Sequence, residues 1–224
     1  MIKNDIFITG TGTDVGKTFI SALILKAMLS SGIKAAYFKA AMSGNSRDEN
    51  NNLIPGDALY VKNVSGTEQP LESMCPYIYE RAYSPHLASQ IEGNPVEHDV
   101  VLEKFHELKR EYDCVIVEGS GGILCPIRFD EHKELWLKDI ITSLNLNCIL
   151  VADAGLGTIN AVGLTAEYMR HNSINLEGII FNHFQPGNIL HEDNLKMCEY
   201  ITGTGIIACV KDNDSEITFR EGEI

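Results

Sequence analysis

The sequence lacks closely spaced cysteines, a long hydrophobic run and an excess of basic residues. Its six cysteines form no CxxC or similar pair, and four lie among apolar residues, which is typical of buried thiols rather than disulfides or metal ligands. The longest apolar stretch, near residues 19–25, is too short to span a bilayer. The first residues already enter a strand-like run, which leaves no room for a signal peptide. We therefore expect a protein of the reducing cytoplasm with no membrane partner.

Basic residues are too few for a nucleic-acid-binding protein. Lys and Arg number 18 against 31 Asp and Glu, which gives a formal net charge of -13. This excess repels nucleic acid and anionic membranes, but it is compatible with a small ligand whose site concentrates the basic residues. The hydrophobic share of 44% and the charged share of 22% are ordinary for a globular protein, and 224 residues fit one domain.

Short strand-like runs alternate with segments of helical periodicity along the chain. This alternation is typical of an α/β domain, in which a mostly parallel sheet carries helices on both faces. The strand candidates are residues 5–9, 35–39, 114–118, 148–152, 178–182 and 206–210, and the helix candidates are 18–31, 98–111, 135–144, 158–171 and 191–201. We predict a single α/β domain over residues 1–224.

Three further segments are irregular. The connections 40–56 and 65–97 are longer than the others, and the terminal segment 211–224 is acidic and weakly patterned. In an open α/β sheet a ligand binds at the carboxyl ends of the strands, so we expect the two connections to border the site. The terminal segment is predicted to be a loose or lid-like tail.

The strongest functional signal is the segment 10–18, which reads GTGTDVGKT. It follows an apolar strand and opens an amphipathic helix, as a phosphate-binding loop (P-loop) does, and it predicts a P-loop NTPase-like domain. Backbone N–H groups of such a loop and the helix N-terminus bind phosphate. Lys17 is predicted to reach the outer phosphates, and the Thr18 hydroxyl to bind Mg²⁺. Thr11 replaces the first glycine of the strict motif, and Gly12 replaces the lysine of partitioning-type ATPases, so the loop is a variant.

An acidic residue follows the third strand candidate. The segment 114–119 reads CVIVEG, and its strand ends in Glu118, where P-loop proteins hold their second acidic Mg²⁺ contact, usually Asp. Glycines 119 and 121 let the backbone approach phosphate. On its own, such an acid is also compatible with an exposed turn. Asp57, in the GDA of 56–58, is on its own a helix N-cap.

Asn182 indicates which base is bound. Guanine-specific P-loop proteins end the corresponding strand with Asn-Lys-x-Asp, whereas 182–185 reads NHFQ. A side-chain amide can pair with N6 and N7 of adenine, so adenine is favoured. The alternative is that Asn182 caps a turn.

Taken together, these segments resemble the dethiobiotin synthetase family. The matching pieces are TGTGTDVGKT at 9–18, YFK at 37–39, SG at 43–44, GDAL at 56–59, SPH at 84–86, VEGSGG at 117–122, LGTIN at 156–160 and Asn182. They occur in the family's order over about four fifths of the chain, and the ordered set is far more specific than any single motif.

The resemblance implies an enzyme that carboxylates 7,8-diaminopelargonate with CO₂ or bicarbonate and MgATP, through a carbamate and its phosphorylated mixed anhydride, and releases dethiobiotin, ADP and phosphate. Lys39 is then the catalytic lysine, and Thr18, Asp57 and Glu118 hold Mg²⁺. The implied ATP contacts are Asp14, Val15, Gly16, Lys17, Thr18, Phe19, Asp57, Glu118, Gly119, Ser120, Gly121, Asn182, His183, Ile206, Ile207 and Ala208, and the implied substrate contacts are Thr13, Ser43, Gly157, Thr158, Ile159 and Asn160. The last four are contributed across the interface of a homodimer.

Physical chemistry is consistent with these implied roles. A carbamate is an anion that must be phosphorylated by another anion, and Lys17 with Lys39 would neutralise the crowded charge. Thr158 is predicted to be a helix N-cap, and the N–H groups at such an end bind carboxylate. Without the resemblance, Lys39 is interpreted as a surface lysine at a strand end, and Thr158 as a cap without a ligand.

The sequence departs from the family pattern in three places. Ala40 stands where the family usually has proline, Asp14 where Glu is frequent, and the segment 206–209 lacks the proline common beside adenine.

Two other functions are alternatives. An amidoligase of the cobyrinic-acid type is expected to carry a glutaminase domain, for which 224 residues leave no space. A nucleotide-dependent switch is disfavoured by Gly12 and by the segment from Lys39 to Ser43.

Overall fold

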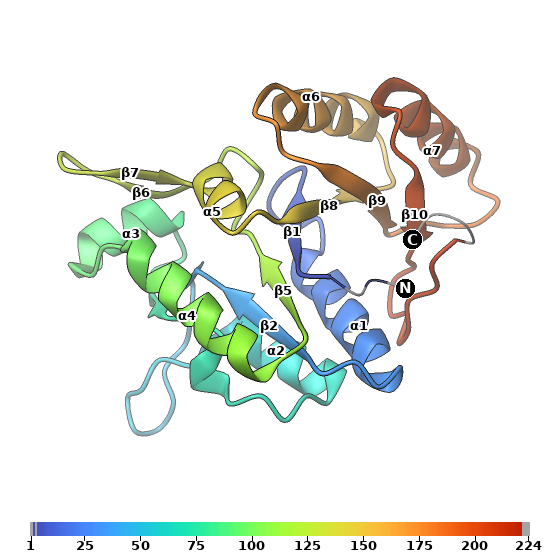
Figure 1. Cartoon of the computed structure of the whole chain (residues 1–224). Coiled ribbons are helices and arrows are strands. Elements are labelled where there is room, and N and C mark those ends of the chain that lie inside the picture. Colours follow the sequence, from blue (N-terminus) through green and yellow to red (C-terminus); the bar gives the residue numbers. More distant parts are fainter. Residues whose placement is uncertain (1, 3, 221–224) are drawn as a thin grey trace.

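A computed structural model describes residue 2 and residues 4–220, and its centre is a six-stranded parallel sheet. The strands are β1 (Ile6–Gly10), β2 (Ala35–Lys39), β5 (Cys114–Glu118), β8 (Asn147–Asp153), β9 (Leu176–Asn182) and β10 (Ile206–Cys209). Their order is β10-β9-β8-β1-β5-β2, so β2 and β10 are the edge strands (Figure 1). This confirms the predicted P-loop NTPase-like α/β fold.

Helices cover both faces of the sheet because its strands are apolar on both sides. One face carries α1 (Lys17–Ser30) and α2 (Gly56–Ser65), and the other carries α4 (His98–Glu111), α5 (Leu137–Ser143), α6 (Thr158–His171) and α7 (Ile189–Thr202). Within β1, Ile6 and Ile8 pack under α1, whereas Phe7 points to the cluster under α4 and α5. Each strand therefore contributes to two hydrophobic cores.

The two long connections contain short elements that the sequence did not predict. They are β3 (Ala41–Met42), a 3-10 helix (Leu71–Ser73), β4 (Tyr77–Ile78) and α3 (Pro85–Glu92). A hairpin of β6 (Pro126–Phe129) and β7 (Glu134–Trp136) lies beside α3. Because β7 occupies 134–136, the helix predicted from residue 135 begins only at Leu137.

The terminal segment is anchored at residues 217–220, whereas most of 211–216 is exposed. Ile217 is buried in the core under α1, Phe219 packs against the same cluster, and the N–H of Arg220 donates to the Ile207 carbonyl at 2.8 Å. The loose or lid-like tail predicted for 211–224 stays a prediction: these contacts anchor its residues 217–220, and 221–224 lie outside the described part. Among the described residues none of the six cysteines forms a disulfide, and no helix is both long and apolar enough to cross a membrane.

Candidate active site

The loop between β1 and α1 carries the predicted phosphate-binding segment. Gly16 is the N-cap of α1 with a φ of 91°, a left-handed conformation that glycine adopts without strain. A Cβ on Gly10 would lie 2.8 Å from Val15 Cγ2, so this glycine lets the loop fold back on itself. The Lys17 ammonium donates to the Gly12 carbonyl at 2.8 Å. The lysine therefore spans the loop at the N-terminus of α1, where N–H groups are available to an anion.

Lys17 is a buried cation without a full counter-charge. It is 7% exposed, and this burial lowers the pKa of its ammonium below the ordinary value. Glu118 opposes the shift, whereas the positive charge of Lys39 adds to it. An anion placed beside Lys17 would favour the charged form, which is the electrostatic condition for phosphate binding.

Glu118 is the most connected side chain of the site. It ends β5 and is 2% exposed. Its Oε1 accepts hydrogen bonds from Thr18 Oγ1 at 2.9 Å and from Lys39 Nζ at 2.7 Å, and its Oε2 accepts from the Tyr37 hydroxyl at 3.0 Å. Burial raises the pKa of Tyr37 well above its ordinary value, and the charge of Glu118 acts in the same direction. The phenol therefore remains a donor at neutral pH.

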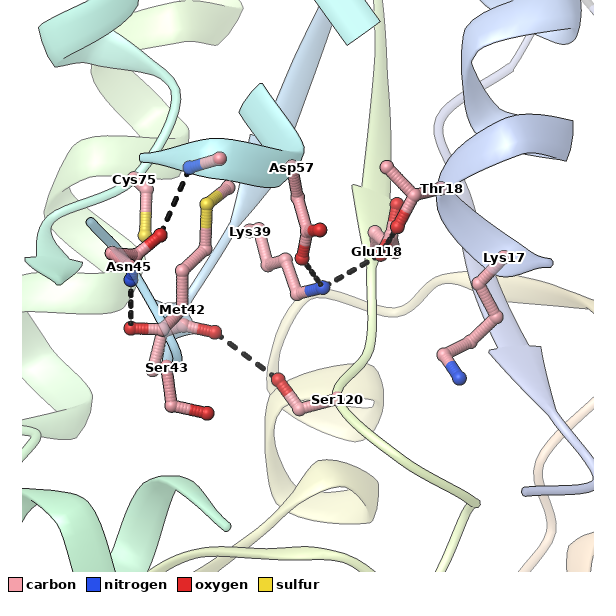
Figure 2. Close-up of polar contacts among 12 residues, drawn as sticks. Lys17, Thr18, Lys39, Met42, Ser43, Asn45, Asp57, Cys75, Glu118 and Ser120 are labelled. Atoms are coloured by element: carbon pink, nitrogen blue, oxygen red, sulfur yellow. Dashed lines mark hydrogen bonds and ion pairs between the residues drawn. The ribbon is translucent and has the colours of Figure 1, made fainter. Parts of the chain in front are cut away.

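Lys39 lies between two carboxylates. Its Nζ is 2.6 Å from Asp57 Oδ2 and 2.7 Å from Glu118 Oε1 (Figure 2). Burial by itself lowers the pKa of Lys39, but the attraction of Glu118 and Asp57 and hydrogen bonds to both outweigh it and raise the pKa. The ammonium is therefore charged at neutral pH.

Two alternatives left open by the sequence do not hold. Lys39 is 6% exposed and so is not a surface lysine. Asp57 is not an N-cap, because Pro55 occupies that position and Asp57 lies in the first turn of α2. There its carboxylate is free to turn toward Lys39 instead of bonding to its own helix.

A cavity of 760 Å³ opens at the carboxyl ends of β1, β2 and β5, a volume typical of small-molecule sites. Its lining brings together eleven of the predicted site residues: Thr13, Asp14, Gly16, Lys17, Thr18, Lys39, Ser43, Asp57, Glu118, Ser120 and Gly121. The Ser43 hydroxyl donates to the Tyr83 carbonyl at 2.5 Å, and that of Ser120 donates to the Ala41 carbonyl at 3.1 Å.

Six lining residues were not assigned by sequence reasoning: Gly44, Ala82, Tyr83, Ser84, Pro85 and Cys125. A signal existed for Gly44, Ser84 and Pro85, which lie in the SG and SPH motifs of the family resemblance. Tyr83 and Cys125 carried no such signal. Burial raises the pKa of the Cys125 thiol, and the nearby ammonium of Lys17 opposes this shift. Cys125 is therefore a neutral thiol on the wall of the cavity.

Other predicted phosphate contacts shape the loop from outside the cavity lining. The N–H of Gly119 donates to the Ile8 carbonyl at 2.9 Å, and a Cβ at this glycine would lie 2.9 Å from the Phe7 ring. The Phe19 side chain packs against the core under α1. These contacts fix the backbone beside the cavity.

Asn182 joins β9 to the P-loop rather than capping a turn. Its Nδ2 donates to the Val15 carbonyl at 3.1 Å, and a Cβ on Gly16 would lie 2.1 Å from this nitrogen. The Oδ1 of Asn182 is buried without a hydrogen-bond partner among the described residues, and an amino group of a ligand could satisfy it. His183 follows with a φ of 57°, and its Nδ1 contacts the Asp212 carboxylate.

Ile206, Ile207 and Ala208 do not belong to the described lining of the cavity. They belong to β10, are at most 1% exposed and pack in the cores on its two faces. The carboxyl end of this strand, where ligands of a parallel sheet bind, leads to Val210 and Asp212. The side chains at 206–208 therefore face the cores, and the nucleotide contact at these positions stays a prediction.

Residues 157–160 lie at the start of α6 and do not belong to the described lining of the cavity. Gly157, with a φ of 93°, is the N-cap, so the prediction of Thr158 as the cap is wrong by one position. Thr158 is buried, and its Oγ1 has no partner among the described residues. One chain alone does not bring Ile159 or Asn160 to Lys39.

Solved structures with the same architecture belong to P-loop proteins. The signal recognition particle 54 kDa protein of Aeropyrum pernix, in complex with GDP, matches with a TM-score of 0.56 and 16% identity over 99% of this chain and 45% of that one. The cell division protein FtsY of Thermotoga maritima matches with a TM-score of 0.53 and 14% identity over 99% of this chain and 66% of that one. At these identities the likeness establishes the fold.

Sequence relatives are much closer. A family model described as an AAA domain matches residues 4–216. The ATP-dependent dethiobiotin synthetase BioD of Brachyspira hyodysenteriae is 47% identical over 92% of this chain and 91% of that protein. The protein of the same name from Clostridium novyi is 44% identical over 96% of this chain and 91% of its own length. The chain therefore belongs to the ATP-dependent dethiobiotin synthetase family.

Proposed function

We propose that the protein catalyses the ATP-dependent carboxylation and ring closure of 7,8-diaminopelargonate, which yields dethiobiotin, ADP and phosphate. The observation that carries this proposal is the buried ammonium of Lys39, held between Asp57 and Glu118 in the cavity of the P-loop. A P-loop hydrolase requires the loop lysine, here Lys17, to bind phosphate. A second buried lysine in the same cavity would face a second anion when its carboxylate partners also hold a cation.

The reaction brings two anions together. One amine attacks CO₂ and loses a proton, which gives a carbamate. A carbamate oxygen then takes the γ-phosphoryl group of ATP, and ADP leaves. The second amine attacks the carbonyl carbon of this mixed anhydride, and phosphate leaves with the amine proton as the ring closes. Lys17 and Lys39 offset the negative charge where the carbamate meets the γ-phosphate.

The oxygen donors of Thr18, Asp57 and Glu118 fit Mg²⁺. This ion prefers oxygen ligands and is usually held by one or two carboxylates together with substrate phosphates. The ammonium of Lys39 contacts both carboxylates, so their oxygens form a site suited to positive charge. Among the described residues no group of three or more His, Cys, Asp or Glu offers an all-protein metal cage. When bound with ATP, Mg²⁺ neutralises charge on the β- and γ-phosphates.

We infer a two-fold homodimer in which residues 157–160 of one chain bind the carboxylate of the substrate in the cavity of its partner. N–H groups at the start of α6 are suited to a carboxylate. Apolar residues are exposed before α6 and along α6 and α7: Leu156 is 92% exposed, Leu164 within α6 65%, and Tyr200 of the adjacent α7 83%. A second copy would cover this apolar face.

The homodimer is tested by Leu164→Glu, which places a charge on the apolar face at a distance from the cavity lining. We expect a monomer by sedimentation that binds MgADP normally but forms little dethiobiotin. Full activity of wild-type protein that is monomeric at nanomolar concentration would contradict the shared site.

Adenine is supported by the unpartnered Oδ1 of Asn182, which can accept from its amino group. Residence in the cytoplasm is supported by six cysteines without a disulfide in the described chain. The net charge of -13 disfavours nucleic acid or an anionic membrane as a partner.

The function is tested by measuring ADP release with and without 7,8-diaminopelargonate and bicarbonate, together with dethiobiotin by mass spectrometry. A synthetase releases ADP in proportion to dethiobiotin and only when both substrates are present. Slow ATP hydrolysis that does not respond to the diamine would instead indicate a nucleotide-dependent switch.

A further inference from the structure

A buried tyrosine lies beneath the charged groups of the site. Tyr37 precedes Lys39 by two residues on β2, so both side chains lie on the same face of the sheet. Tyr37 is 0% exposed, and its hydroxyl is within hydrogen-bond distance of Glu118, 3.0 Å from Oε2. It reaches the site from the core side and takes no part in the described lining of the cavity.

The two oxygens of Glu118 have different partners. Oε1 accepts from Thr18 and Lys39, the residues that face the phosphates, whereas Oε2 accepts from Tyr37. A carboxylate can rotate about its terminal bond unless both oxygens are held. The Tyr37 hydroxyl fixes Oε2 toward the core, and this leaves Oε1 as the oxygen presented to the cavity.

Tyr37 is itself held by a buried amide. Its N–H donates to Gln69 Oε1 at 2.8 Å, and its carbonyl accepts from Gln69 Nε2 at 2.9 Å. Gln69 is 1% exposed, and its Nε2 also donates to Ser73 Oγ at 3.1 Å. Gln69 therefore holds the backbone of Tyr37, and the side-chain hydroxyl of the same tyrosine holds Glu118.

The geometry points to Tyr37 as a positioning residue that orients Glu118 for the metal–nucleotide complex, with Gln69 holding Tyr37 in turn. This inference depends on the proposed function only in taking Glu118 as a contact of Mg²⁺. Partners that orient metal ligands typically change metal affinity or activity by about 10- to 100-fold when they are removed. Loss of the Tyr37 hydroxyl also leaves a buried carboxylate oxygen unpartnered, which disfavours the single orientation of Glu118.

The test compares wild type with Tyr37→Phe, which removes one hydroxyl and keeps the ring in the core. ADP binding is measured by calorimetry with Mg²⁺ and with EDTA. We expect ADP affinity in EDTA to stay within about 2-fold of wild type, while the gain produced by Mg²⁺ falls by about 10-fold or more. Because dethiobiotin formation is not measured, failure of the synthetase assignment does not affect this result.

The matched control is Tyr79→Phe, which removes another buried phenol hydroxyl, one that donates to the Asn94 carbonyl at 2.6 Å. This variant is expected to lower the melting temperature but to leave the gain in ADP affinity produced by Mg²⁺ unchanged. Gln69→Met provides a second variant and should weaken the effect of Mg²⁺ in the same direction, but less. The inference is overturned if Tyr37→Phe responds to Mg²⁺ as wild type does.

Glu118→Gln separates the positioning role of Tyr37 from the role of Glu118 as a metal contact. If it loses the effect of Mg²⁺ while Tyr37→Phe keeps it, Tyr37 has no positioning role and the metal assignment stands. If Glu118→Gln itself keeps the full effect, Glu118 is no metal contact and the inference falls with that assignment.

Discussion

The site has two proposed ends. At the phosphate end, side chains from β2, β5, α1 and α2 contact one another. The base end consists of the amide of Asn182 and the exposed side chains of His183 and Asp212. Glu118 accepts three hydrogen bonds from side chains, and Lys39 contacts two carboxylates. The side chains of His183 and Asp212, by contrast, are 42% and 60% exposed, and Asn182 Oδ1 has no described partner.

Contacts within the protein thus organise the proposed phosphate end, whereas the proposed base end keeps a buried amide oxygen that a base would pair. Preorganised charges stabilise a transition state most, because they need no rearrangement during the reaction. A single hydrogen bond to a base contributes only about 1 kcal/mol. We therefore expect large losses of turnover from changes at the phosphate end and small shifts of selectivity from changes at the base end.

The largest effect is expected for Lys17→Ala and Thr18→Ala. Each removes a fixed partner of the phosphates or of Mg²⁺, so turnover at saturating MgATP should fall by at least about 10²-fold. Lys26→Ala is the matched control: this half-buried lysine of the same helix donates to the Ser215 carbonyl and does not belong to the described cavity lining, so turnover should be nearly unchanged. Near-normal turnover of Lys17→Ala would refute the assignment of the P-loop.

Lys39→Ala is expected to lose the chemical step while nucleotide binding weakens only slightly. An interaction made mainly in the transition state lowers kcat and kcat/KM together, here by about 10²-fold. Lys39→Arg should rescue poorly, because a planar guanidinium does not replace a compact ammonium between two carboxylates. Calorimetry with ATP, run beside dethiobiotin formation, checks both parts. A normal rate for Lys39→Ala would remove the catalytic role.

Gly16→Ala tests whether the two ends are independent. Its φ of 91° disfavours alanine by about 1–2 kcal/mol, and the new methyl group would lie 2.1 Å from Asn182 Nδ2. We expect MgATP affinity to fall by about 10-fold. Adding Asn182→Ala should restore part of the loss, because it removes the colliding amide. Additive losses in the double variant would show that the amide and the loop do not compete for space.

The smallest effect is expected at the base. Wild type should prefer ATP over GTP, since no Asn-Lys-x-Asp segment follows β9. Asn182→Ala should reduce the ratio of kcat/KM values for ATP and GTP by about 5-fold, the contribution of roughly one hydrogen bond. Equal kcat/KM for both nucleotides in wild type would show that Asn182 does not read the base.

Sequence reasoning succeeded where the signal was local. The GTGTDVGKT loop and the strands 35–39 and 114–118 have the predicted bounds or nearly so, because glycine spacing and apolar runs determine them within a few residues. The hydrogen bond from Tyr37 to Glu118 spans 81 residues and left no local pattern. The hairpin β6–β7 was missed because its strands are short and half-exposed, and Glu134–Trp136 resembles the start of the next helix.

The segment 69–74 covers the edge strand β2 and thereby affects how the protein aggregates when it partly unfolds. An edge strand offers unpaired N–H and C=O groups to other chains. Here Gln69 occupies the N–H and carbonyl of Tyr37, and the Met74 carbonyl accepts the N–H of Lys39 at 2.9 Å. If the segment 69–74 detached, an apolar strand carrying a buried lysine would become a template for intermolecular β-pairing. Aggregation on heating should therefore begin at this edge, and its onset marks the release of one short segment rather than the melting of the sheet.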